Sequence, residues 1–110
     1  MKDTVYKGCW PTMITPFTSD NKIDYPAVEA LTRWYIDRGA DGIFAVCQSS
    51  EMFFLSEEEK TDLAKAVVEA ADGAIKVIAS GHTADDHAKQ IDQLGKIAEK
   101  GVDAVVLVSN

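Results

Sequence analysis

Four short apolar runs alternate with three amphipathic stretches along the chain. The runs at residues 42–46, 76–80 and 103–110 are apolar at successive positions, which is typical of parallel strands covered on both faces. A weaker run at residues 8–15 contains Pro11, and proline is tolerated near the start of a strand, where its missing donor costs little. The pattern therefore predicts four strands.

The first amphipathic stretch carries the start and stop signals of a helix over residues 25–38. Asp24 is placed to cap the first turn, Pro26 is compatible with that turn, and Gly39 follows the last turn. We expect the inward face of this helix to consist of Ala27, Ala30, Leu31 and Trp34.

The second and third amphipathic stretches also begin with capping signals and end at glycines. Ser56 and the three glutamates after it form a capping box, and Gly73 ends this second helix. Thr83, with Asp86 three residues later, is predicted to open a third helix that ends at Gly101. The residues expected to face the core are Leu63, Ala66, Val67 and Ala70 in the second helix and Ala84, Ala88, Ile91, Leu94 and Ala98 in the third.

Strand and helix alternate throughout, which predicts an α/β fold, a parallel (βα)3β unit with right-handed crossovers. Residues 1–110 then form a single partial domain with strands one to four and helices one to three. The joint from helix to strand occurs twice, as RGADGIFAV from Arg38 and KGVDAVVLV from Lys100. This order fits an open sheet as well as part of a barrel. Because strands one and four would both be apolar edges, which promote aggregation, the pattern indicates a piece of a larger sheet.

Composition and charge narrow the class of protein. With 110 residues, of which 46% are hydrophobic, the chain can bury one modest core. Its formal charge of −7 argues against attraction to nucleic acid or to an anionic membrane surface. No run reaches the roughly 20 apolar residues of a membrane span, and the start lacks the apolar core of a signal peptide. We therefore expect a cytoplasmic protein in which Cys9 and Cys47 are reduced thiols.

Polar residues follow three of the predicted strands, at the edge where parallel α/β proteins bind their ligands. These residues are Thr15 after the first strand, Gln48, Ser49, Ser50 and Glu51 after the second, and Ser80, Gly81 and His82 after the third. Their hydroxyls and backbone amides can hold a carboxylate or a phosphate. They can equally satisfy the backbone groups of the loops themselves.

Other residues near this edge favour structural roles. Residues 52–55, which read MFFL, favour packing over a cofactor site. His82 is either an acid or base or a hydrogen-bonded loop residue, whereas His87 is expected at the surface. Cys47 is better explained as a small buried residue than as a nucleophile, because no histidine adjoins it. Neither metal-ligand spacing nor a glycine-rich phosphate loop is found, so we expect no metal and no cofactor.

Several motifs together resemble the start of the dihydrodipicolinate synthase and N-acetylneuraminate lyase family. In order along the chain they are TPF at residues 15–17, Asp24, the joint Gly39-x-Asp41-Gly42, a polar loop ending in Glu51, LSxEE from Leu55, and VIAS at residues 77–80. The family consists of class I aldolases with a TIM (β/α)8 barrel, in which a lysine forms a Schiff base with pyruvate or a related 2-oxo acid. The resemblance implies that this chain is the amino-terminal half of such a barrel.

The resemblance also assigns roles in the loop after the second strand. The family's Gly-Thr-Thr-Gly-Glu stands in register with CQSSE, residues 47–51. Ser49 keeps the hydroxyl expected to bind the substrate carboxylate. Gln48 replaces a relay threonine, and an amide cannot pass a proton as a hydroxyl does, while Ser50 replaces a glycine. The substrate-binding residues implied are Gln48, Ser49 and Ser50.

The family's catalytic residues are not found in this stretch of sequence. The resemblance places the Schiff-base lysine and the catalytic tyrosine beyond Asn110. Lys76 lies at the amino end of a strand, opposite the expected site, and is not nominated. We therefore expect the 110-residue chain alone to be inactive and the protein to be a homo-oligomer. The alternative is a non-catalytic, self-associating half-barrel that binds small anions.

Overall fold

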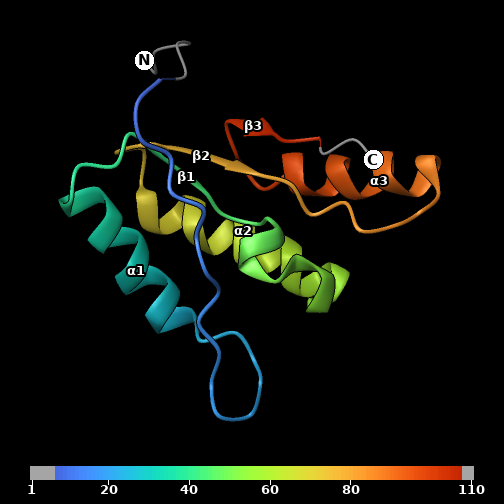
Figure 1. Ribbon diagram of the computed structural model, residues 1–110, viewed down its shortest axis with the longest axis horizontal. Helices are drawn as coiled ribbons and strands as arrows, with labels where there is room; N and C mark the ends of the chain where they lie inside the picture. The colour runs from blue at the N-terminus through green and yellow to red at the C-terminus, as the bar shows by residue number, and fades with distance from the viewer. Residues whose placement is uncertain (1–6, 108–110) are drawn as a thin grey trace.

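A computed structural model describes residues 7–107 of the chain and contains a three-stranded parallel sheet (Figure 1). The strands, in both sequence and spatial order, are β1 (Gly42–Phe44), β2 (Lys76–Ala79) and β3 (Ala104–Val105). The helices that alternate with them are α1 (Tyr25–Asp37), α2 (Glu57–Ala71) and α3 (His87–Ala98). The register pairs Ile43 with Val77 and Ile78 with Ala104. The predicted parallel α/β order is confirmed, although the strands are shorter than predicted and residues 108–110 lie outside the described part.

The predicted first strand at residues 8–15 is wrong, because only Thr12 pairs with β1, opposite Phe44. Phe44 donates its N–H to the Pro11 carbonyl oxygen at 3.0 Å and accepts the N–H of Met13 at 2.9 Å. Pro11 has no N–H, and the N–H of Cys9 donates to a side chain instead of a neighbouring strand. The segment therefore runs beside β1 with too few donors for a regular strand.

The repeated helix-to-strand joint ties each new strand to the segment that precedes the intervening helix. Asp41 accepts the N–H of Cys9 on its carboxylate at 2.7 Å and returns its own N–H to the Cys9 carbonyl at 2.9 Å. Asp103 does the same with Val77, at 2.8 Å in both directions. The aspartate common to the two motifs thus makes a reciprocal backbone contact, which explains why the sequence uses the same joint twice.

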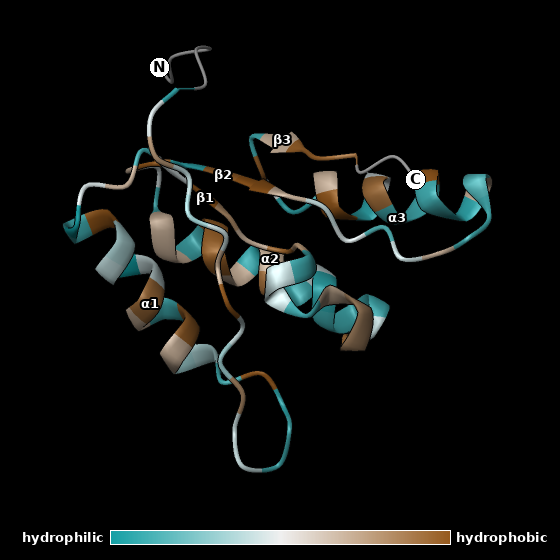
Figure 2. Cartoon of the chain, in the orientation of Figure 1, coloured by the Kyte–Doolittle hydropathy of each residue, from teal (hydrophilic) through white to brown (hydrophobic). Residues whose placement is uncertain are grey.

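The core lies between the sheet and the inward faces of α1 and α2, and the hydrophobic strands β1 and β2 stand out in Figure 2. The inward face of α1 differs from the prediction, because Val28 and Thr32 are buried while Trp34 is 50% exposed. The Thr32 hydroxyl donates to the Val28 carbonyl oxygen at 2.8 Å, so burying this polar residue leaves no donor unsatisfied. The ring of Trp34 instead lies under the guanidinium of Arg38.

The start of α2 is as predicted, and its inward face is so in part. Ser56 and Glu59 form the capping box, with N–H to side-chain distances of 2.9 and 3.1 Å. Leu63 and Val67 are buried as expected, whereas the predicted Ala66 and Ala70 are only partly buried. The remaining buried positions of the helix are Lys60, Ala64 and Ala71.

The predicted start and stripe of α3 are wrong. The helix begins at His87 rather than near Thr83, and Asp86 at its N-cap position makes no side-chain capping bond. Ile91 of the predicted stripe is 61% exposed, and Ile97 is the buried residue of the helix. The N–H groups of Thr83 and Ala84 donate to the side-chain oxygen of Gln93, further along α3. These two residues therefore stay outside the helix.

Candidate functional site

The loop after β1 folds into two 3-10 turns at the carboxyl end of the sheet. These turns are η1 (Gln48–Ser50) and η2 (Met52–Phe54). The N–H groups of Ser50 and Met52 both donate to the carbonyl oxygen of Cys47, at 3.0 and 3.2 Å. Glu51, between the turns, has a φ of 62°, a left-handed conformation that is uncommon outside glycine and that reverses the chain. The loop is therefore compact, and the Cys47 carbonyl oxygen at its start holds both turns.

Two adjacent hollows open at this edge of the sheet. The larger has a volume of about 160 Å³, and its polar lining residues are Thr12, Gln48, Ser49 and Ser80. The smaller, about 120 Å³, is lined in part by Gln48, Met52, His82, Thr83 and Gln90. Both hollows are lined by Gln48 and Met52. Polar residues from the segment beside β1, the loop after β1 and the segment after β2 therefore lie close together here.

Gln48 and Ser49 are both exposed, and both line the larger hollow. Ser50, next to them, is completely buried. Its hydroxyl contacts the carbonyl oxygens of Met13 and, at 2.5 Å, Ala45. The turn of η1 thus points Ser50 into the protein and leaves its two predecessors at the hollow.

Thr15 supports the same loop from the segment before α1. Its hydroxyl donates to the carbonyl oxygen of Ser50 at 2.6 Å, and the residue is buried. The Cys47 sulfur lies 3.3 Å from the Ser50 hydroxyl. Cys47 is buried and both cysteines are free thiols, as predicted. Thr15, Cys47 and Ser50 therefore fix the shape of the loop from beneath.

The segment after β2 supplies Ser80 to the larger hollow and His82 to the smaller one, and both side chains are buried. Among residues 7–107, the Ser80 hydroxyl has no hydrogen-bond partner, although burying an unpaired hydroxyl costs about 1–3 kcal/mol. Gly81 has a φ of +99°, and a Cβ there would lie 3.2 Å from Ile97. Glycine is therefore needed in this tight segment. Ser80 belongs to the lining of the larger hollow, although the residue itself is fully buried.

Lys60 is a buried residue that the sequence analysis missed. Its side chain is 2% exposed, and its ammonium group is 2.6 Å from the Glu57 carboxylate and 2.9 Å from the Gly81 carbonyl oxygen. Helical spacing was the available signal, because Lys60 stands three residues before Leu63 and seven before Val67, on the inward face.

The remaining predicted residues divide between the core and the surface. Met52 and Leu55 are buried as packing residues, whereas Phe53 and Phe54 are exposed. His87 is exposed, as predicted. Lys76 begins β2, at the opposite end of that strand from Ser80.

A further hollow, about 540 Å³, lies elsewhere, between α1 and α2. It is lined in part by Tyr25, Glu29, Arg33 and Glu69. Arg33 is paired with Glu29 at 3.0 Å. Burial, and then the carboxylates of Asp62, Glu59 and Glu58, raise the pKa of the Tyr25 hydroxyl. The negative surroundings make this groove unsuitable for an anion.

In the part of the chain that the structure describes, no group of three His, Cys, Asp or Glu side chains is placed to hold a metal ion. No helix among the same residues is long and apolar enough to cross a membrane.

Comparison with known proteins gives consistent matches along the chain. The Dihydrodipicolinate synthetase family matches residues 5–109. The 4-hydroxy-tetrahydrodipicolinate synthase of Polynucleobacter asymbioticus is 36% identical over 103 residues, which cover 93% of this chain and 33% of that protein. The structure of the 4-hydroxy-tetrahydrodipicolinate synthase from Methylacidiphilum fumariolicum matches with a TM-score of 0.88 and 31% identity, over 96% of this chain and 34% of the other.

A third match is the chloride-inhibited dihydrodipicolinate synthase from Acinetobacter baumannii complexed with pyruvate. Its TM-score is 0.87 at 30% identity, over 93% of this chain and 35% of the other. The chain spans about a third of the length of the curated relatives it matches. The alternation of parallel strands and helices corresponds to the amino-terminal part of their TIM barrel, so the predicted fold is confirmed. The chain belongs to the dihydrodipicolinate synthetase family.

Proposed function

We propose that residues 1–110 form the amino-terminal half of a Schiff-base-forming lyase or aldolase that acts on pyruvate or a related small 2-oxo acid. The observation that carries this proposal is the larger hollow at the carboxyl ends of β1 and β2, where Gln48, Ser49 and Ser80 meet. Its size suits a small acid, and hydroxyl and amide donors suit a carboxylate. The proposal includes a cytoplasmic homo-oligomer without a cofactor, as family membership suggests.

In this proposal the chain binds the substrate carboxylate and leaves the covalent chemistry to residues beyond Asn110. Ser49 donates its hydroxyl to the carboxylate, and the longer amide of Gln48 shapes the pocket beside it. Ser50 contributes through the loop that it holds, since its own hydroxyl contacts the carbonyl oxygens of Met13 and Ala45.

Neither Lys60 nor Lys76 suits Schiff-base formation, in which an uncharged amine attacks the ketone carbon and water leaves. The Lys60 ammonium already donates to three oxygens, on Glu57, Gly81 and Thr83, so its nitrogen is engaged within the protein. Lys76 lies at the far end of β2. We therefore place the nucleophile outside residues 1–110.

Borohydride reduction in the presence of pyruvate tests the proposal, because hydride converts the C=N bond into a stable secondary amine. The complete protein should gain the mass of one reduced pyruvyl group, on a peptide beyond residue 110. Residues 1–110 alone should keep their mass. An adduct on a lysine within residues 1–110 would falsify the assignment. A complete protein that binds pyruvate without forming an adduct would favour the alternative, a non-catalytic anion-binding protein.

A further inference from the structure

The buried ammonium group of Lys60 connects the start of α2 to the loop that follows β2. It lies 2.6 Å from the carboxylate of Glu57, 2.9 Å from the carbonyl oxygen of Gly81 and 2.8 Å from the hydroxyl of Thr83. An ammonium group has three donors and no acceptor, so these three oxygens match its full capacity. Two of them belong to the loop, whose place is thereby fixed relative to the helix.

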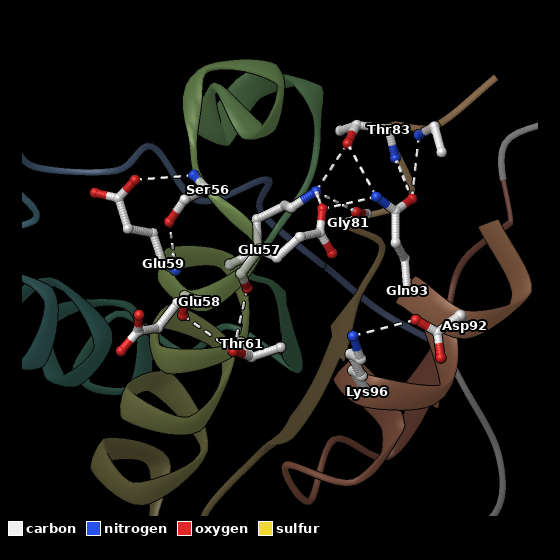
Figure 3. A network of polar contacts seen from close by, with 12 residues as sticks. Ser56, Glu57, Glu58, Glu59, Thr61, Gly81, Thr83, Asp92, Gln93 and Lys96 are labelled. Carbon is white, nitrogen blue, oxygen red and sulfur yellow. Dashed lines mark hydrogen bonds and ion pairs between the residues drawn. The ribbon is translucent and has the colours of Figure 1, made fainter. Parts of the chain in front are cut away.

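Gln93 on α3 holds the same loop from the other side, as Figure 3 shows for Glu57, Gly81, Thr83 and Gln93. Its side-chain oxygen accepts the N–H groups of Thr83 and Ala84, at 2.9 and 3.1 Å. Its side-chain nitrogen donates to the Glu57 carboxylate at 2.7 Å. Glu57 therefore joins Lys60 and Gln93 into a single network that spans α2, the loop and α3.

The loop held in this way carries two residues of the candidate site. Ser80 precedes Gly81 and lines the larger hollow, while His82 lies between the two residues that Lys60 contacts and lines the smaller hollow. A shift of the Gly81 carbonyl would move both neighbours, because they are joined to it through the backbone. The network thus sets the positions of Ser80 and His82 at the hollows, although Lys60 makes no direct contact with a ligand.

A charged group specifies the position of the loop more strictly than an apolar side chain would. An apolar residue at this inward position of α2 could pack against several placements of the loop. The ammonium group must keep its acceptors, because a buried charge that loses them is strongly unfavourable. Glu57 is half-exposed, whereas Lys60 is buried. The contacts of Lys60 with the loop therefore hold the loop more firmly than its pairing with Glu57 does.

We propose that Lys60 is a positioning residue, which sets Ser80 and His82 at the edge of the ligand site by fixing the loop after β2 from α2. This inference rests on the proposed function, because it assigns ligand binding to the hollows. Lys60 itself touches neither the ligand nor the reacting atoms.

The test uses the complete protein with three variants, Lys60→Met, Gln93→Leu and the control Lys65→Met. Lys65 is an exposed residue of α2 that pairs with Glu69 at 3.9 Å. Each protein is titrated with pyruvate by calorimetry, melted, and examined by hydrogen exchange at the backbone amides of residues 81–84. We expect Lys60→Met to weaken pyruvate binding by about ten-fold and to speed exchange at these amides.

Gln93→Leu keeps the charge of Lys60 and removes the contacts that hold the loop from α3. It therefore tests whether the loop position controls pyruvate binding even if Lys60→Met does not fold. We expect faster exchange at Thr83 and Ala84 and weaker pyruvate binding, with Lys65→Met like the parent in both measurements. Unchanged pyruvate affinity in a folded Gln93→Leu variant whose loop exchanges faster would overturn the positioning role alone. A parent protein that binds no pyruvate would overturn the proposed function, and this inference with it.

Discussion

Ser49 and Ser50 are the same residue type at successive positions, yet their surroundings are opposite. Ser49 is exposed at the larger hollow, whereas Ser50 is completely buried against the carbonyl oxygens of Met13 and Ala45. The tight turn of η1 creates this difference, because successive side chains in such a turn point in different directions. A hydroxyl at the first position is available to a ligand, and a hydroxyl at the second is already used.

Replacing Ser49 tests the exposed position. Ser49→Ala removes one charge-assisted hydrogen bond worth about 1.5–3 kcal/mol, so pyruvate affinity of the complete protein should fall by about ten- to a hundred-fold. Gln48→Ala should weaken binding less, since the amide shapes the pocket rather than holding the carboxylate. Ser56→Ala serves as the control, because it changes a helix cap and should leave affinity near that of the parent. Calorimetric titration that finds Ser49→Ala equal to the parent would remove Ser49 from the site.

Replacing Ser50 tests the buried position through stability. Ser50→Ala leaves the carbonyl oxygens of Met13 and Ala45 without this donor, and the free energy of unfolding should fall by about 1–3 kcal/mol. Ser49→Ala is the matched control, because an exposed substitution usually changes stability by less than about 0.5 kcal/mol. Urea denaturation of the complete protein measures both. Equal midpoints for the two variants would show that the Ser50 contacts contribute no stability.

At the scale of elements, each of α1, α2 and α3 has an acidic or hydroxyl residue at its N-cap position, but only those of α1 and α2 accept a backbone N–H on the side chain. Ser56 caps α2 and receives the reciprocal contact of Glu59. Asp86 precedes α3 and makes no side-chain capping bond. The side chains of Gln90 and Gln93 instead tie the loop before α3 to the helix.

The two caps therefore give a paired prediction. Ser56→Ala should lower the free energy of unfolding of the complete protein by about 1 kcal/mol, because one first-turn N–H loses its acceptor. Asp86→Ala should change it by only a few tenths, which reflect interaction with the helix dipole, about 0.3 kcal/mol. Chemical denaturation compares them. A larger loss for Asp86→Ala than for Ser56→Ala would contradict the observed capping.

Sequence patterns predicted those elements whose signals are local. The capping box of α2 and the apolar run of β1 are short-range features, and each is present in the structure. The inward faces of α1 and α3 were predicted less well, because polar residues occupy them. Thr32 satisfies itself within its helix, whereas Gln93 finds partners on a loop that is ten residues away in sequence. Such partners are known only once the fold has placed them.

The candidate site likewise combines features that the sequence predicted with features that depend on the fold. The sequence indicated that polar residues gather at the ends of the strands, and the structure places Gln48, Ser49 and Ser80 around one hollow. The sequence did not indicate that Ser50 turns inward. That orientation depends on the left-handed conformation of Glu51 and on the contacts of the η1 turn. Lys60 was passed over because a lysine near a helix start ordinarily lies in solvent.

At the scale of the whole molecule, the sheet has apolar residues at both of its sides. Among the described residues, the segment at Thr12 pairs only with β1, and β3 pairs only with β2. Ile14 is 60% exposed beside the first of these edges, and Leu107 is 64% exposed just after β3. Exposed apolar edges of this kind are templates for pairing with another chain. The rest of a barrel would cover them in a complete family member.

Residues 1–110 prepared alone should therefore self-associate through these edges. Light scattering at rising concentration should show dimers or larger species, and Val105→Lys should reduce them, because an edge lysine opposes strand pairing. Ile91→Lys is the matched control, since Ile91 is an exposed residue of α3 and does not belong to a strand. It adds the same charge, so any general gain in solubility appears in both variants. If Ile91→Lys suppresses association as strongly as Val105→Lys, the contact is made by the helices, and the exposed strand edges are not its cause.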